Sequence, residues 1–125
     1  MKYMIMMFGS QRDIDMLTGK STDRPAWSAE DVGKLHAFMG SWSQALVESG
    51  ELVDGHGLSA PVHARRIQVR EGLPVVTDGP YAETKEIIGG LAILECENLD
   101  DAIEVAAKVP LATRGSVELR PIIEH

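Results

Sequence analysis

The residues from Met4 to Phe8 read MIMMF and are apolar at every position. Successive side chains of a strand point to opposite faces of its sheet, so this run predicts a central strand that is covered on both sides. The run is too short for the apolar part of a signal peptide, and it ends at the polar segment from Gly9 to Asp13. We therefore interpret it as the first strand of a cytoplasmic protein.

Two later segments have the apolar periodicity of helices. The first begins at Ser28, a candidate N-cap with Asp31 three residues on, and ends at Gly50, the expected left-handed residue. Its apolar face comprises Val32, Leu35, Met39, Trp42 and Leu46. The second begins after Asn98 and is expected to end at Pro110. Its inward residues are expected to be Leu99, Ala102, Ile103 and Ala106. Before the first helix, residues 9–27 predict a long loop.

The remaining segments predict strands and a topology. Residues 52–53 lead into a bend at 54–57, residues 63–70 and 73–77 form a hairpin around Glu71-Gly72, and residues 87–94 and 117–123 complete the set. The resulting order, β-α-β-β-(β)-β-α-β, predicts a single α+β domain over residues 1–125, with a ferredoxin-like split βαβ arrangement, an antiparallel sheet and an added hairpin. Two helices cover only one face of such a sheet. The other face would be exposed and apolar, which predicts a homodimer through the sheet face.

Composition and motifs argue against several classes of function. The net charge of −7 disfavours binding to nucleic acid or to an anionic membrane surface, and nothing approaches the ~18 consecutive apolar residues of a membrane span. The single Cys96 allows no intramolecular disulfide, and Glu95 and Glu97 beside it disfavour a reactive thiolate. Asp54 and His56 offer two metal ligands without the spacing of a metal motif, and no nucleotide-binding motif occurs. We therefore expect no metal or cofactor.

The segment VVTDGPYAETKEIIGG, residues 75–90, interrupts an apolar strand with Asp78-Gly79-Pro80. One interpretation is a turn, in which Gly79 supplies a positive φ and Asp78 accepts a hydrogen bond from a backbone N–H of residues 80–83. The other is a site, in which the turn fixes Asp78 at the mouth of a pocket. Partial burial there would raise the pKa of its carboxyl and allow it to act as a general base. We expect both roles.

Two histidines are candidates to assist Asp78. His56 lies between Gly55 and Gly57, which would leave its ring accessible. His36 lies on the shoulder of the first helix, about 100° from the centre of its apolar face. Each histidine is also consistent with a loop or surface position that has no role in chemistry.

Three segments carry a resemblance to a known family: MKYMIMMFG, VTDGPYAETKE followed by IGG, and GSVELRPI. From residue 1 to about 124 the chain resembles the DGPF-domain proteins of the YCII-related family, with Tyr81 where the family has phenylalanine. The resemblance implies a dimeric α+β barrel in which two sheets pack face to face. One branch of the family includes a dehydrochlorinase that acts on a chlorinated hydroxyquinol, for which a His–Asp pair has been suggested. Met39 stands about where that branch has its histidine, so only Asp78 matches the pair.

Two functions remain open. The first is a small-molecule acid–base enzyme of the lyase or isomerase type, with Asp78 as base and His56 or His36 assisting. The second is a non-catalytic ligand-sensing or protein-interaction module linked to sigma-factor regulation, because relatives of the DGPF branch are often encoded beside extracytoplasmic-function sigma factors. An Asp78 that lines a closed pocket beside a histidine would favour the enzyme. An Asp78 bonded only to backbone N–H groups would favour the module.

Overall fold

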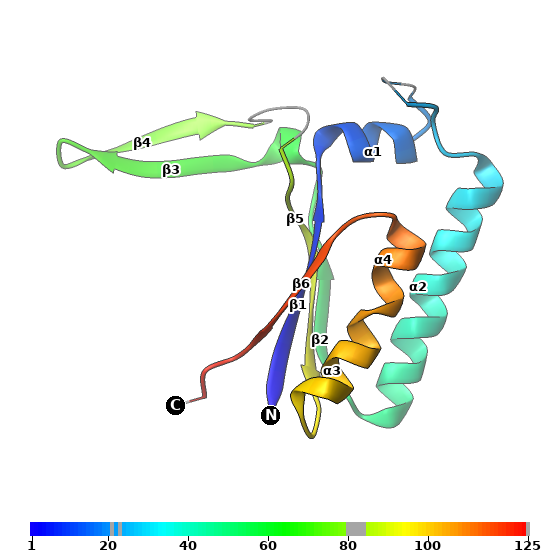
Figure 1. The fold of residues 1–125 in the computed structure, drawn as a ribbon. Helices are drawn as coiled ribbons and strands as arrows, with labels where there is room; N and C mark the ends of the chain where they lie inside the picture. The colour runs from blue at the N-terminus through cyan, green and yellow to red at the C-terminus, as the bar shows by residue number, and fades with distance from the viewer. Residues whose placement is uncertain (21, 23, 80–84, 125) are drawn as a thin grey trace.

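The computed structural model describes residues 1–20, 22, 24–79 and 85–124 (Figure 1). Its elements are β1 Lys2–Gly9, α1 Gln11–Leu17, α2 Ala29–Ser49, β2 Leu52–Gly57, the 3-10 turn η1 Pro61–His63, β3 Arg65–Arg70, β4 Leu73–Asp78, β5 Ile87–Glu95, α3 Leu99–Ala106, α4 Lys108–Thr113 and β6 Val117–Pro121. The order of elements expected from the sequence is confirmed, and α1, η1 and α4 are additions to it.

Four of the strands form one antiparallel sheet in the order β2-β5-β1-β6. The first strand is therefore central, and the last strand returns to lie beside it, as in a ferredoxin-like split βαβ fold. The helices α2, α3 and α4 lie together on one face of this sheet (Figure 1). We call the opposite face, which the described helices leave open, the uncovered face.

The core lies between the sheet and these helices. Tyr3, Ile5 and Leu94 are almost completely buried there, and the indole nitrogen of Trp42 donates a hydrogen bond to the carbonyl oxygen of Val105 at 3.2 Å. Alternation along paired strands places a second apolar set on the uncovered face: Met4, Met6, Leu91 and Ile93. The N-terminal run thus contributes apolar side chains to both faces, as its sequence predicts.

The predicted helix boundaries are largely confirmed. The Ser28 hydroxyl accepts a hydrogen bond from the backbone N–H of Asp31 at 3.1 Å, and Gly50 ends α2 with φ 79°. The Asn98 side chain caps α3 in the same way, through the N–H of Asp101 at 2.9 Å. These side chains satisfy N–H groups that the first turn of a helix leaves without an intrahelical acceptor.

Several local expectations were wrong. Residues 9–27 are not one loop, because Ser10 and Asp13 form a reciprocal capping box that starts α1. Residues 54–57 do not bend away; they continue β2 along β5 after a bulge near Val53. Pro110 does not end the second predicted helix, because α3 already ends at its C-cap Ala107 and a new helix, α4, begins there. Pro110 lies in the first turn of α4, where its missing N–H is not needed.

The inward face of α3 was only half predicted. Ala102 and Ala106 are buried as expected, whereas Leu99 and Ile103 are about half exposed. The small alanines allow α3 to approach the sheet closely, and this orientation turns the neighbouring stripe outward.

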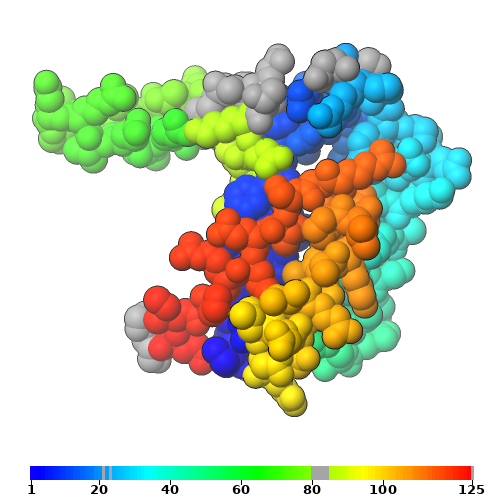
Figure 2. All heavy atoms as spheres, in the orientation of Figure 1, coloured from blue at the N-terminus to red at the C-terminus, as the bar shows by residue number. Residues whose placement is uncertain are grey.

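The added hairpin projects from the body as an arm made of β3 and β4, which pair only with each other (Figures 1 and 2). Its turn is at Glu71 and Gly72, as predicted, and both residues have positive φ, 52° and 76°. This is the geometry of a type I′ turn, which matches the twist of a two-residue hairpin. The apolar residues Ile67 and Val69, which alternate along β3, are 69% and 73% exposed, because the arm projects away from the main sheet.

Candidate functional site

A cavity of about 980 Å³ lies between α2 and the covered face of the sheet. The ends of β1, β2 and β5 form one wall, α2 forms another, and α1 with residues 24–27 lies over it. A hydrogen bond from the backbone N–H of Trp27 to the carbonyl oxygen of Met16, 3.0 Å long, ties this covering segment to α1. Most of the lining side chains are apolar, including Met7, Phe8, Leu35, Met39 and Trp42.

The apolar face of α2 explains why this space exists. Its C-terminal part, at Trp42 and Leu46, is buried against the sheet. Its N-terminal part, at Leu35 and Met39, instead lines the cavity. One continuous apolar stripe is therefore packed over half of its length and faces open space over the other half.

A group of polar residues lies at one side of the cavity. Nη2 of Arg114 lies 3.3 Å from Oδ2 of Asp31 in an ion pair, and the guanidinium carbon of Arg114 lies 4.0 Å from the centre of the Trp27 ring. These three lining residues come from the loop after α4, from the first turn of α2 and from the covering segment. Their contacts join these three segments at one side of the cavity.

The backbone holds Arg114 in an unusual conformation. Its φ is 60°, in the left-handed region that costs a residue with a side chain about 1 kcal/mol or more. Its N–H donates to the carbonyl oxygen of Pro110 at 2.9 Å and ends α4. At the next residue, Gly115, a Cβ would lie 3.0 Å from the carbonyl oxygen of Phe8, so only glycine fits comfortably against the end of β1. The loop is thus fixed from both sides of Arg114.

Asp78 does not lie among the residues that line this cavity. It ends β4 at the base of the arm, where Oδ1 lies 3.1 Å from Nε of Arg65 on the paired strand, and its side chain is 76% exposed. The expected hydrogen bond from residues 80–83 lies outside the described residues, as does Tyr81.

Gly79 shows what the motif contributes to the fold. Its N–H donates to the carbonyl oxygen of Ala64 at 2.9 Å, and its φ is not in the left-handed region. A Cβ at this position would collide with the carbonyl oxygen of Pro61 and lie 3.2 Å from that of Ala64. Glycine is therefore required here for close backbone approach to η1, and the positive φ suggested by the sequence is not the reason.

His56 lies at the edge of the cavity and has a carboxylate neighbour. Its Nε2 is 3.0 Å from Oδ1 of Asp54, two residues earlier on β2. Pairing of His56 with Leu91, and of Asp54 with Ile93, places both side chains on the uncovered face. The backbone of β2 at His56 therefore borders the cavity, while its imidazole lies on the other side of the sheet.

The third predicted site residue, His36, is exposed on α2 and is not among the residues that line the cavity. The side chains of Asp78, His56 and His36 therefore do not meet at one cavity of the described residues. The group at Arg114 was not identified from the sequence. Its available signals were a basic residue followed by glycine just after a helix, and a tryptophan in a polar segment.

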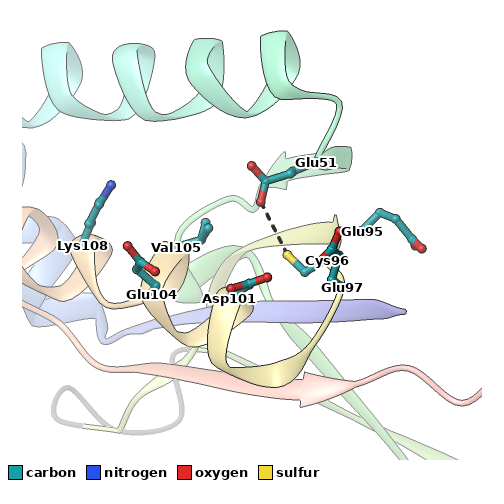
Figure 3. A pocket seen from close by; sticks show the side chains of 8 residues that line it. All are labelled: Glu51, Glu95, Cys96, Glu97, Asp101, Glu104, Val105 and Lys108. Atoms are coloured by element: carbon teal, nitrogen blue, oxygen red, sulfur yellow. Dashed lines mark hydrogen bonds between the residues drawn. The ribbon is translucent and has the colours of Figure 1, made fainter.

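A second, smaller cavity of about 430 Å³ surrounds Cys96 at the other end of the sheet (Figure 3). Glu51 and Asp101 lie near the thiol, Glu104 lines the cavity farther along α3, and Sγ is 3.7 Å from Oε2 of Glu51. Burial, followed by the Glu51 carboxylate, raises the pKa of the Cys96 thiol. The predicted poor nucleophile is thus confirmed in direction, although the carboxylates responsible are Glu51 and Asp101 and not the sequence neighbours Glu95 and Glu97.

The described residues offer neither a metal-binding cluster nor a membrane-spanning helix. Within residues 1–20, 22, 24–79 and 85–124, no cluster of three or more histidine, cysteine, aspartate or glutamate side chains could hold a metal ion. In the same part of the chain, no helix has both the length and the apolar character needed to cross a membrane.

Comparison with known proteins places this fold and sequence in a family. A protein of Rhizobium meliloti (strain 1021) described as uncharacterized is 32% identical over 99 residues, which are 78% of this chain and 80% of the relative. The profile of the YCII-related domain matches residues 1–125. The chain therefore belongs to the YCII-related domain family.

Proposed function

We propose that the protein binds a small organic molecule in the cavity beneath α2, with the apolar part of the ligand against Leu35 and Met39. The observation that supports this is the half-packed apolar stripe of α2. Small-molecule sites are commonly concave, mostly apolar and about 300–1,000 Å³ in volume, with a few fixed polar groups. The cavity of about 980 Å³ with one polar side has these properties.

Calorimetric titration with 2-naphthamide, a neutral apolar probe, tests this proposal. We expect binding with a negative heat-capacity change, because apolar surface is buried. Met39→Trp should occupy part of the apolar side of the cavity and weaken binding. Val47→Trp, on an exposed part of the same helix, is the matched control and should leave binding unchanged. Failure of the wild type to bind, or equal binding by Met39→Trp, would refute the proposal.

Acid–base catalysis of the lyase or isomerase type is a second proposal, at a different place from the cavity. A histidine within hydrogen-bond reach of a carboxylate is a proton-transfer pair, and the pair of His56 and Asp54 favours catalysis on the uncovered face, across the sheet from the cavity. Asp78 and His36 stay secondary candidates, since each is exposed and outside the cavity. The alternative is a ligand-sensing module linked to sigma-factor regulation. Turnover of a compound that His56→Gln removes, with binding of 2-naphthamide in the cavity unchanged, would separate catalysis from sensing.

A homodimer through the uncovered face is a further part of the proposal. The apolar set Met4, Met6, Leu91 and Ile93 lies on a face that the described helices leave open, and the arm projects beside a hollow on the same side (Figure 2). A second copy placed there would bury both surfaces and would give the dimeric α+β barrel implied by the resemblance. Sedimentation velocity should show a dimer at micromolar concentration. A stable monomer under these conditions would exclude this assembly.

A further inference from the structure

The charge that a ligand carries follows from which of the charged cavity residues can accept another partner. Each of the two lining carboxylates already has a near partner: Asp13 accepts the backbone N–H of Ser10 at 2.9 Å, and Asp31 forms an ion pair with Nη2 of Arg114 at 3.3 Å. A guanidinium has five N–H donors in a planar fork, and the contact with Asp31 uses one nitrogen of that fork. The groups with the larger remaining capacity are therefore the two lining cations, Arg24 and Arg114, and Arg114 is the one that contacts both Asp31 and Trp27.

Arg114 is also held in place before any ligand arrives. The Trp27 ring lies against its guanidinium group, and the backbone on both sides is fixed by the bond to Pro110 and by the close packing of Gly115 on β1. A pre-positioned fork matches the two oxygens of a carboxylate and loses little side-chain entropy on binding. The left-handed conformation of Arg114 beside a cavity is the kind of strained position that functional sites tend to retain.

Asp31 is the partner of Arg114 that a ligand carboxylate would replace. Its side chain is 36% exposed and that of Arg114 is 56% exposed, so their ion pair is screened by solvent and contributes little to stability. A ligand carboxylate can therefore bind the guanidinium group beside Asp31, or in its place, with little loss of stability. Asp31 therefore acts as an internal stand-in for the anionic group of the ligand.

We propose that Arg114 determines the specificity of this cavity and that the ligand is an organic monoanion, a carboxylate on an apolar body. This inference rests on the proposed binding function and adds to it the charge and the recognising residue. The apolar body would lie against Leu35 and Met39, and the carboxylate would bind the guanidinium group beside Trp27.

A matched pair of probes tests the inference: 2-naphthoate, which carries the carboxylate, and 2-naphthamide, which has the same body without charge. The wild type should bind 2-naphthoate at least about tenfold more tightly, as expected for a charge-assisted hydrogen bond. Arg114→Gln should remove this preference and leave the affinity for 2-naphthamide within about twofold. Arg114→Lys should keep part of the preference, because the charge remains and the fork is lost. Asp31→Asn should strengthen binding of 2-naphthoate, since the competing carboxylate is gone.

Arg70→Gln is the control, because Arg70 is at the tip of the arm and the variant makes the same change in net charge. It should keep the wild-type preference, and thermal unfolding should show that each variant is folded. If both probes bind the wild type equally, if Arg114→Gln keeps the preference, or if Asp31→Asn weakens 2-naphthoate, the inference is wrong while the proposed binding function stands. If neither probe binds, the proposed function fails and the inference fails with it.

Discussion

The substitution Gly79→Ala tests the structural role of the Asp78-Gly79-Pro80 motif. The new Cβ would collide with the carbonyl oxygen of Pro61 and would lie 3.2 Å from that of Ala64. Both oxygens belong to the backbone, and neither can swing away as the end of a long side chain could. The oxygen of Pro61 also accepts the N–H of Ala64 at 2.9 Å, so moving it disturbs η1.

The expected cost follows from these contacts. Forcing one extra carbon into a close-packed site costs about 1–3 kcal/mol. Weakening the hydrogen bond from the Gly79 N–H to Ala64 adds about 1 kcal/mol. Replacing glycine by alanine restricts the unfolded chain and returns roughly 0.4–1 kcal/mol. We therefore expect a net loss of about 1–3.5 kcal/mol in the free energy of unfolding, or a fall in Tm of roughly 4–15 °C.

Gly40→Ala is the matched control for this measurement. Gly40 lies inside α2, and a Cβ there would have nothing within 4 Å. The same change should stabilise the protein by about 1 kcal/mol, because alanine is the better helix former. Urea unfolding followed by circular dichroism, at one fixed protein concentration, measures both variants. If Gly79→Ala unfolds within about 0.5 kcal/mol of the wild type, the close-approach argument is refuted.

Three further predictions concern single side chains. Asp78→Asn should keep the fold and Asp78→Ala should cost no more than about 1 kcal/mol in urea unfolding, because the ion pair at the base of the arm is exposed; if Asp78 is the base, Asp78→Asn should also abolish catalysis in any turnover assay. Cys96 of the folded protein should react with iodoacetamide more slowly at pH 8 than Cys96 of the urea-unfolded protein, because its raised pKa leaves less thiolate at that pH. Glu51→Gln should lower this pKa and speed the reaction of the folded protein. Equal rates for the folded wild type, the unfolded wild type and the variant would contradict this. Ile67→Asp should weaken self-association in sedimentation velocity if the apolar arm contacts a second copy, whereas the adjacent polar substitution Gln68→Asn should not.

The fold was predictable because local signals and the order of elements agreed. Ser28, Gly50 and Asn98 mark helix ends through bonds that involve near neighbours in sequence, and Glu71-Gly72 marks a turn in the same way. The error at residues 9–27 arose although a local signal was present. The capping box of α1 is formed by Ser10 and Asp13, but that segment otherwise reads as polar and irregular.

The site was much less predictable than the fold. Arg114, Asp31 and Trp27 are far apart in sequence and meet only because three walls of one cavity converge. Asp31 had a sufficient local explanation in its position after a helix cap. Conversely, the motif around Asp78 requires glycine at position 79 because the backbone there lies against residues 61–64. That contact depends on where the arm leaves the sheet. Sequence spacing alone contains neither relationship.

The two edge strands of the main sheet, β2 and β6, disfavour self-association by edge-to-edge strand pairing. At one margin, β2 carries a bulge near Val53 that breaks the regular spacing of its ladder. At the other, β6 ends in Pro121, which has no N–H to offer a neighbouring strand. Such features discourage a foreign strand from extending the ladder sideways, which is the first step toward open-ended fibres. A chain protected in this way can expose apolar side chains on a broad face and still be directed toward a closed assembly of finite size.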